Sequence, residues 1–208
     1  MNLNETDSLE KEMQLTGLQI IERPEAINYD RLYELIYRAH ENTRKLGIKI
    51  NTKISNGDQL RESIEQNNMT VYVAMLDGKP AGTISTKIET GKCRFVKGHT
   101  VSYVAYVAVL PEFKGYGIGK ALCEKAEEYA NDHGAEAVGL YVAHRNPAVE
   151  FYSHIGYEKI EFLPRIKLKQ YAVYEVKWLK NCSTPKWVRT LYFRTRKAYV
   201  TFKYHFDQ

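Results

Sequence analysis

The stretch VAVLPEFKGYGIGKAL, residues 107–122, decides the fold, because it joins an apolar run to the start of a helix through a glycine-rich turn. Glycine occupies three alternate positions, Gly115, Gly117 and Gly119. Without a Cβ atom the chain can turn sharply and present consecutive N–H groups to a ligand pressed against it. The N-terminal end of a helix adds a partial positive charge. The stretch therefore predicts an anion-binding turn suited to a pyrophosphate.

Two common phosphate-binding patterns do not fit this turn. A Walker loop needs glycine where this sequence has Lys114, and Ser or Thr where it has Ala121. The dinucleotide fingerprint needs glycine at Lys120 and belongs in the first strand–helix unit of a chain, whereas several strands are expected before this turn. The pattern that remains is Lys114-x-x-Gly117-x-Gly119 between a strand and a helix.

Hydrophobic periodicity and turn signals along the rest of the chain predict an α/β fold. We expect a strand over 18–25, one helix over 28–47, a helix over 56–68, a hairpin over 70–86 that turns at Asp77-Gly78, a strand over 100–110, a helix from the glycine turn to Gly134, a strand over 135–143, a helix over 146–155, and strands over 157–163 and 171–179. A strand–helix–strand crossover thus surrounds the glycine turn.

Composition favours one globular domain. The 208-residue chain is 44% hydrophobic, enough to bury a full core. Its cysteines, Cys93, Cys123 and Cys182, have neither CxxC nor Cys/His ligand spacing, so they support neither a disulfide framework nor a zinc site. The first 17 residues contain no apolar signal-peptide core, and no run of ~18 apolar residues occurs. We expect a cytoplasmic protein that carries no metal.

Two motifs together resemble the GNAT superfamily of acetyl-CoA-dependent N-acetyltransferases over about residues 18–179. The glycine turn stands where that family carries its pyrophosphate loop, and NPAVEFYSHIGYE, residues 146–158, is similar to a second family segment. The resemblance implies a mixed, mostly antiparallel central sheet with helices on both faces. Residues 1–17 then form a polar leader and residues 180–208 an extension. Lys114 replaces the family's Arg or Gln, which keeps the charge but loses the planar guanidinium.

The resemblance also implies which residues bind acetyl-CoA as co-substrate. The backbone of the strand before the turn would pair with the pantetheine arm, the turn would hold the pyrophosphate, and Asn146 would lie near the pantetheine or the sulfur. These residues are Val107, Ala108, Val109, Lys114, Gly115, Tyr116, Gly117, Ile118, Gly119, Lys120 and Asn146. Asn146 would serve equally well as a helix N-cap.

Tyr152 matches the family position that donates a proton to the CoA sulfur. A phenol of pKa ~10 and a thiol of pKa ~8.5 are close enough to share a proton. A tyrosine here also suits a hydrophobic core with a satisfied hydroxyl.

The general base is open. Many members of the family use a glutamate on the strand before the loop, but residues 100–110 contain no acidic residue. The alternatives are Tyr103 or Tyr106 holding a water chain, Glu112, His144, or direct loss of the proton to water.

The expected acceptor is the primary amine of a small molecule that lies against residues 40–58 and 163–170. The basic residues there, which favour an acidic or phosphorylated acceptor, are Lys45, Lys49, Lys53, Arg165, Lys167 and Lys169. One alternative is protein or peptide N-acetylation by the same chemistry. Another is a non-catalytic module that binds CoA, which the missing strand glutamate favours and Tyr152 disfavours.

The extension at residues 180–208 is basic and aromatic. It holds seven Lys/Arg and one acidic residue, whereas the preceding residues are nearly neutral. Its pattern is typical of an amphipathic helix or of two strands. It would pack on its own domain, pair with a second copy in a homodimer, or contact an anionic membrane surface as a peripheral protein. The neutral body gives no reason to expect nucleic acid.

Overall fold

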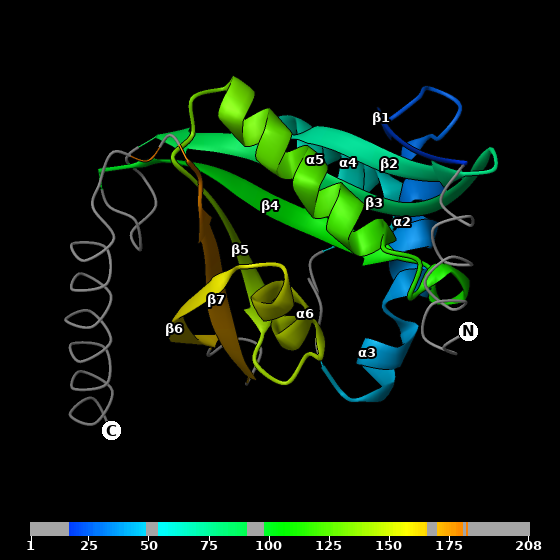
Figure 1. Ribbon diagram of the computed structural model, residues 1–208. Helices are drawn as coiled ribbons and strands as arrows, with labels where there is room; N and C mark the ends of the chain where they lie inside the picture. Colours follow the sequence, from blue (N-terminus) through cyan, green and yellow to red (C-terminus); the bar gives the residue numbers. More distant parts are fainter. Residues whose placement is uncertain (1–16, 49–53, 91–97, 166–169, 181, 183–208) are drawn as a thin grey trace, which may run out of the picture.

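The computed structural model describes residues 17–48, 54–90, 98–165, 170–180 and 182. Its elements in chain order are β1 (Leu18–Glu22), α2 (Tyr29–Ala39), α3 (Glu41–Lys45), α4 (Gly57–Gln66), β2 (Thr70–Leu76), β3 (Lys79–Thr90), β4 (Thr100–Val109), η1 (Pro111–Phe113), α5 (Ile118–Asp132), β5 (Ala137–Ala143), α6 (Ala148–His154), β6 (Glu158–Arg165) and β7 (Gln170–Trp178). Figure 1 shows these elements in the colours of the sequence.

The strands form one seven-stranded sheet in the order β1-β2-β3-β4-β5-β7-β6. All neighbours are antiparallel except β4 and β5, which the crossover through α5 makes parallel. The expected mixed, mostly antiparallel sheet is therefore confirmed.

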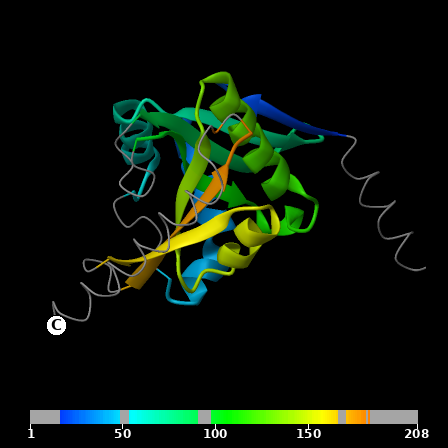
Figure 2. The same cartoon turned by 60° about the vertical axis from the view of Figure 1, so that its left-hand side comes forward.

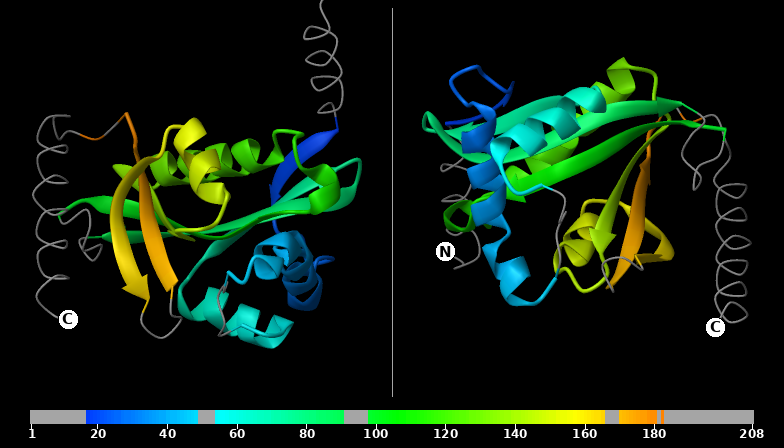
Figure 3. Two further views of the ribbon diagram at one scale, coloured as in Figure 1. Left: turned by 90° about the horizontal axis from the view of Figure 1, so that it is seen from below. Right: turned by 180° about the vertical axis from the view of Figure 1, so that it is seen from behind.

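Helices cover both faces of the sheet, as predicted. Helix α5 lies across β3 and β4 on one face, and α2 and α4 cover the other, as Figures 1 and 3 show from opposite sides. Helix α6 packs on β5, β6 and β7 on the same side as α5 (Figure 2). Buried residues of α5 and α6 belong to one core, so these two helices are held in a fixed relation.

Local sequence signals explain several element boundaries. Asp77 and Gly78 both take positive φ angles, 50° and 74°, in the tight turn between β2 and β3, which confirms the predicted hairpin. The side chains of Asn28 and Asn56 cap α2 and α4 by accepting hydrogen bonds from the backbone N–H groups of Arg31 and Gln59.

One predicted helix is wrong. The apolar periodicity of residues 28–47 predicted a single helix, but the structure divides it at His40, whose φ and ψ of −98° and 11° end α2 and begin α3. The His40 ring hydrogen-bonds to the backbone of Val107 on β4. This tertiary contact, which no local pattern can show, coincides with the break.

The leader, the extension from residue 183 onward, and the basic residues Lys49, Lys53, Lys167 and Lys169 lie outside the described residues. No helix within the described part of the chain is long and apolar enough to cross a membrane.

Candidate active site

The central feature of the site is a split between two strands of the sheet. Strands β4 and β5 pair from Val101 to Val104 and from Ala137 to Leu140. Beyond these residues β5 continues beside β7, while β4 continues beside β3. In Figure 1 the two halves of the sheet diverge toward α6. We call this side of the β4–β5 pair the open end.

A bulge in β4 accompanies the split. The register between β3 and β4 shifts between Thr83 and Ser85, and Tyr106 takes a positive φ of 52°. Val107, Ala108 and Val109 follow the bulge and have no β5 partner in the described pairing. The backbone groups of this segment that face away from β3 thus have no β5 partner, although the Val107 backbone hydrogen-bonds to the His40 ring.

The N-terminus of α5 meets the end of β4 through the glycine turn. Gly115 and Gly117 adopt φ angles of 89° and 71°, which explains why glycine occupies both positions. Gly117 is the N-cap, and α5 has neither a side-chain cap nor an acidic residue in its first turn. Helices α2 and α4 both carry asparagine caps, whereas the longer α5 has no side-chain cap. The N–H groups of the first turn of α5 therefore lack a side-chain acceptor and suit an external anion.

Gly119 has a different role from the other two glycines. A Cβ atom at this position would lie 3.2 Å from Phe151 of α6 and 3.8 Å from Val109 of β4. The small residue therefore lets the first turn of α5 approach both elements. Gly119 brings the glycine turn, the free edge of β4 and α6 to one place.

Tyr152 lies on α6 beside this junction and is 5% exposed. Its ring packs edge-on against Phe151 and Tyr157, with centroids 5.1 and 5.6 Å away. Burial, followed by the neighbouring Cys123 and Glu175, holds the pKa of the Tyr152 hydroxyl well above its usual value. The hydroxyl is therefore a protonated group at neutral pH, as an acid must be.

Asn146 forms a local hydrogen bond at the start of α6, whose N-cap position is Pro147 rather than the predicted Asn146. Its side-chain oxygen accepts a hydrogen bond from the backbone N–H of Ala148 at 3.0 Å. The residue is half-buried between the end of β5 and α6.

Glu175 is a residue that the sequence analysis missed. It is completely buried on β7, and neither carboxylate oxygen has a hydrogen-bond partner. Its register partner is Leu140, the last residue of β5 that also pairs with β4. Glu175 therefore lies level with the point where β4 and β5 separate, which we call the apex of the split. Burial raises its pKa to about 7, partly offset by Lys159. The alternation of apolar and polar residues in a strand sequence does not show whether a glutamate is buried or faces solvent.

His40 forms part of the opposite wall and was also missed. Burial, then Arg44, lowers the pKa of its imidazole to about 4, and Lys114 acts in the same direction against the hydrogen bond to Val107. The ring is thus neutral at physiological pH and lies between the glycine turn and the bulge of β4.

The face of the sheet opposite α5 carries an aromatic row. Tyr103 of β4 lies 5.9 Å from Tyr141 of β5, which in turn lies 4.9 Å from Tyr174 of β7, measured between ring centroids. The Tyr174 hydroxyl passes over Gly139, where any Cβ atom would clash. The row crosses from β4 to β5 and so borders the split.

All four candidate bases interact with neighbouring residues. Glu112 forms an ion pair with Arg38 of α2 at 2.9 Å. The Tyr106 hydroxyl lies 2.8 Å from the Ser63 hydroxyl of α4. Tyr103 belongs to the aromatic row, and His144 is exposed just after β5. Both of these border the open end.

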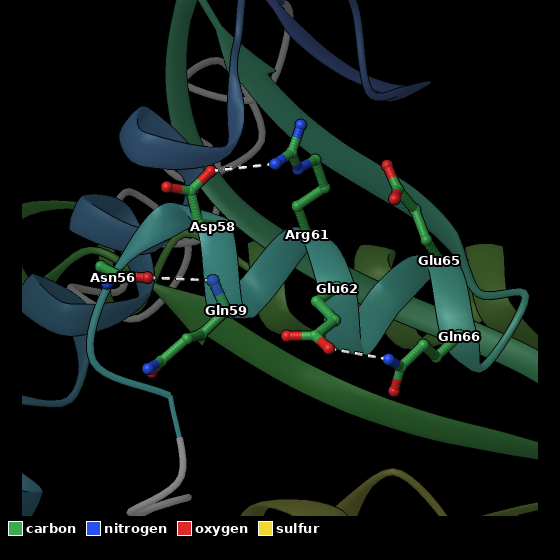
Figure 4. Close-up of a pocket in the computed structure, with 7 residues that line it drawn as sticks. All are labelled: Asn56, Asp58, Gln59, Arg61, Glu62, Glu65 and Gln66. Carbon is green, nitrogen blue, oxygen red and sulfur yellow. Dashed lines mark hydrogen bonds and ion pairs between the residues drawn. The ribbon is translucent and has the colours of Figure 1, made fainter.

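A separate surface hollow lies along the outer side of α4 and is unrelated to this site. Figure 4 shows its lining side chains, which satisfy one another through the Arg61–Asp58 ion pair and the Gln66–Glu62 hydrogen bond. All of them come from one helix and the residue that caps it, so the hollow is a groove between exposed side chains.

The fold is a mixed α/β sheet in which a bulged strand leaves its parallel neighbour beside an uncapped helix N-terminus. The chain belongs to the GNAT family, because the Acetyltransferase (GNAT) family profile matches residues 29–157.

Several relatives share this part of the chain. An uncharacterized N-acetyltransferase of Methanocaldococcus jannaschii is 35% identical over 94 residues, 43% of this chain and 39% of that protein. The S-(2-succino)cysteine N-acetyltransferase of Bacillus subtilis is 31% identical over 131 residues, 62% of this chain and 77% of that enzyme. The N-alpha-acetyltransferase of Sulfolobus acidocaldarius is 30% identical over 111 residues, 49% of this chain and 64% of that enzyme.

Solved structures share the fold at low sequence identity. A GNAT-family acetyltransferase from Staphylococcus aureus superposes with a TM-score of 0.60 at 19% identity, covering 78% of this chain and 99% of that one. The NatC complex bound to Gag peptide and CoA contains a chain with a TM-score of 0.57 at 17% identity and the same coverage.

Proposed function

We propose that the protein transfers the acetyl group of acetyl-CoA to the primary amine of a small molecule. The observation that carries this proposal is the free edge of β4 from Val107 to Val109 beside the uncapped start of α5. An extended amide-bearing arm that ends in a pyrophosphate satisfies both sets of backbone groups at once.

The open end provides a place for each part of acetyl-CoA. The N–H groups from Gly115 to Lys120 would hold the pyrophosphate, with the Lys114 ammonium adding charge. The backbone of Val107, Ala108 and Val109 would pair with the pantetheine arm. The buried Ile118 side chain anchors the turn in the core, so only its backbone would meet the ligand. The thioester then comes to lie near Tyr152, because Gly119 packs the turn against the neighbouring Phe151.

The reaction joins the amine nitrogen to the acetyl carbonyl carbon and breaks the carbon–sulfur bond. Acetyl-CoA supplies an activated acetyl group and a thiolate leaving group. The Tyr152 hydroxyl donates its proton to the departing sulfur, and its raised pKa keeps that proton in place until charge develops there.

The ammonium proton leaves through water at the bordering groups Tyr103 and His144. Glu112 would have to leave its ion pair with Arg38, and Tyr106 its hydrogen bond with Ser63, before either could act as a base. Turnover that falls in His144→Gln but not in Tyr103→Phe would identify the histidine, and the reverse result would identify the tyrosine.

The acceptor would approach from the aromatic row, past His40. Arg44 and Lys114 both act on His40 electrostatically, so this wall of the site is positively charged. A positive wall favours an amine that also carries a carboxylate or phosphate. The Bacillus relative, whose name specifies S-(2-succino)cysteine, is consistent with such an acceptor.

Thiol release from acetyl-CoA tests this proposal. The full chain should turn over with a small amine that carries an acidic group, and more slowly with polyamines. Turnover with peptides alone would replace the small-molecule acceptor with a protein one. Binding of acetyl-CoA without turnover across amino acids, amino sugars, polyamines and peptides would support the non-catalytic alternative.

Protein N-terminal acetylation is the second candidate, and the Sulfolobus N-alpha-acetyltransferase favours it. An extended peptide would lie along the same aromatic row. Competition separates the two, because a small acidic amine should raise the apparent KM for a peptide only if both occupy one acceptor site.

A further inference from the structure

The β4–β5 pair has a second end, on the side away from α6. The side chains at this end have no part in the proposed acetyl transfer. Here His99 precedes β4, Glu136 precedes β5, and Cys182 follows β7. One nitrogen, one carboxylate oxygen and one sulfur from these residues all lie within 4.8 Å of one another. We call this group the strand-end cluster.

The backbone fixes the three positions relative to one another. The Glu136 N–H donates to the Thr100 carbonyl at 2.8 Å, and the Leu179 N–H donates to the Glu136 carbonyl at 2.9 Å. The Cys182 N–H donates to the Leu179 carbonyl at 3.2 Å. Hydrogen bonds thus connect the residues that flank the ends of β4, β5 and β7, and each bond holds one member of the cluster or its neighbour.

The side chains are also held in place. The His99 Nδ1 atom lies 2.9 Å from a Glu136 carboxylate oxygen, which also accepts from the Thr100 N–H at 3.4 Å. The His99 ring also packs edge-on against the Trp178 ring, with the ring centroids 5.1 Å apart. His99 and Glu136 are 19% and 23% exposed, so a small ion can reach the cluster from solvent.

Imidazole nitrogen, carboxylate oxygen and thiolate sulfur together form a donor set that suits zinc. Zinc takes nitrogen and oxygen at about 2.0–2.2 Å and sulfur at about 2.3 Å in a tetrahedron. Donor atoms around such an ion are roughly 3.3–3.7 Å apart. The His99 and Glu136 donor atoms, now 2.9 Å apart, would separate slightly to admit the ion, and all three donor atoms already lie within 4.8 Å of one another. Calcium and magnesium prefer oxygen ligands alone and do not suit this set.

We propose that His99, Glu136 and Cys182 bind one zinc ion, with water in the fourth position, and that the ion ties the closed end of the sheet together. The site lies beyond the hydrogen-bonded part of the β4–β5 pair, away from Tyr152 and the glycine turn. Its role is therefore structural, and metal binding and acetyl-CoA binding are independent.

Cobalt substitution gives the most specific test. The full chain, first treated with a chelator, is titrated with Co²⁺ and separately with Zn²⁺. We expect one ion per chain, a cobalt spectrum with tetrahedral visible bands and a thiolate charge-transfer band, and a rise in Tm with Zn²⁺. Cys182→Ser should abolish the charge-transfer band, and His99→Gln should weaken Zn²⁺ binding at least tenfold.

The matched controls are His133→Gln, an exposed histidine at the end of α5, and Cys123→Ala, a thiol buried in the core. Both should bind the metal as the wild type does. Cys182→Ala is a second variant in case the serine perturbs the strand end. Binding below one ion per chain, or affinities of Cys182→Ser and His99→Gln within twofold of wild type, would overturn the proposal.

A change of acetyl-CoA affinity in Cys182→Ser would contradict the independence of the two ends. If acetyl transfer fails but stoichiometric zinc binding persists, the zinc proposal stands and the proposed function falls. If acetyl transfer persists but zinc does not bind, the proposed function stands and the zinc proposal falls.

Discussion

The two ends of the β4–β5 pair differ although the same two strands form both. At the closed end, the pairing from Val101 to Val104 continues into backbone bonds that link the flanking residues of β4, β5 and β7. At the open end, a bulge at Tyr106 turns β4 away and leaves the edge from Val107 to Val109 without β5. One end pairs its backbone groups across β4 and β5, whereas at the other end β4 has no β5 partner.

The difference teaches how this sheet combines rigidity with binding. Unpaired strand edges invite unwanted association, and proteins usually cover or close them. Here the open edge is short, and α5 and α6 close over one side of it. The closed end pairs the two strands by hydrogen bonds up to the point where they separate.

The largest expected effect concerns Tyr152. Tyr152→Phe keeps the ring packing but removes the acid, so turnover should fall by about 10²–10⁴-fold with little change in acetyl-CoA affinity. Tyr157→Phe is the matched control, since Tyr157 is equally buried and packs against Tyr152. Steady-state kinetics with calorimetry would measure both. Turnover of Tyr152→Phe within a few-fold of wild type would make Tyr152 a packing residue.

The second prediction concerns the bare start of α5. Gly117→Glu places bulk and negative charge where the pyrophosphate would bind, so acetyl-CoA affinity should fall by about 100-fold or more. Gly134→Glu is the control, because Gly134 lies at the other end of α5 with nearly the same φ, 69° against 71°. Both variants carry similar backbone strain. Equal affinities in calorimetry would refute the anion site.

The third prediction concerns Glu175, which lies level with the apex of the split. Its pKa rises from 4.5 to about 7 in the folded protein. The folded state therefore binds this proton more tightly than the unfolded chain, so its contribution to stability is full below pH 4.5 and is lost as pH rises through 7.

Glu175→Gln removes this dependence. The stability difference between Glu175→Gln and wild type should change by on the order of 3 kcal/mol between pH 4.5 and pH 8, in favour of the variant at high pH. Urea unfolding at several pH values measures it, and the exposed Glu124→Gln should show no such change. A constant difference across this range would mean that the carboxyl group has a partner in solution.

The smallest expected effect concerns Asn146. Asn146→Ala should destabilise the protein by about 0.5–2 kcal/mol through loss of its hydrogen bond at the start of α6. Asn28→Ala, which removes the cap of α2, should cost a similar amount. Only Asn146→Ala should also raise the KM for acetyl-CoA, if its second predicted role is correct. An unchanged KM would leave Asn146 with its local hydrogen bond alone.

Much of the fold follows from local patterns in the sequence. The turn at Asp77-Gly78, the cap at Asn56 and the glycine turn each have a specific chemical signal, so the elements around them were predicted. The resemblance to the GNAT family added the mixed, mostly antiparallel character of the sheet and the helices on both of its faces. The break at His40 was not predictable, because it coincides with a contact to Val107 on a distant strand.

The backbone geometry of the glycine turn was predictable from the sequence. Gly115 and Gly117 need positive φ angles, and the sequence shows this directly. Glu175 and the strand-end cluster were not predictable, because their members become neighbours only through the pairing of β4, β5 and β7. Ligand spacing in the sequence reveals local metal sites and misses those built from three strand ends.

Hydrogen–deuterium exchange of the full chain with and without acetyl-CoA tests the central claim most directly. We predict that acetyl-CoA slows exchange of the amides at residues 107–109 and 115–120 and leaves those at 101–104 and 137–140 unchanged. The free edge of β4 gains a partner at the open end, whereas the closed end already has one. Equal protection of both ends, or no protection in the glycine turn at saturating acetyl-CoA, would contradict the assignment of the open end as the binding site.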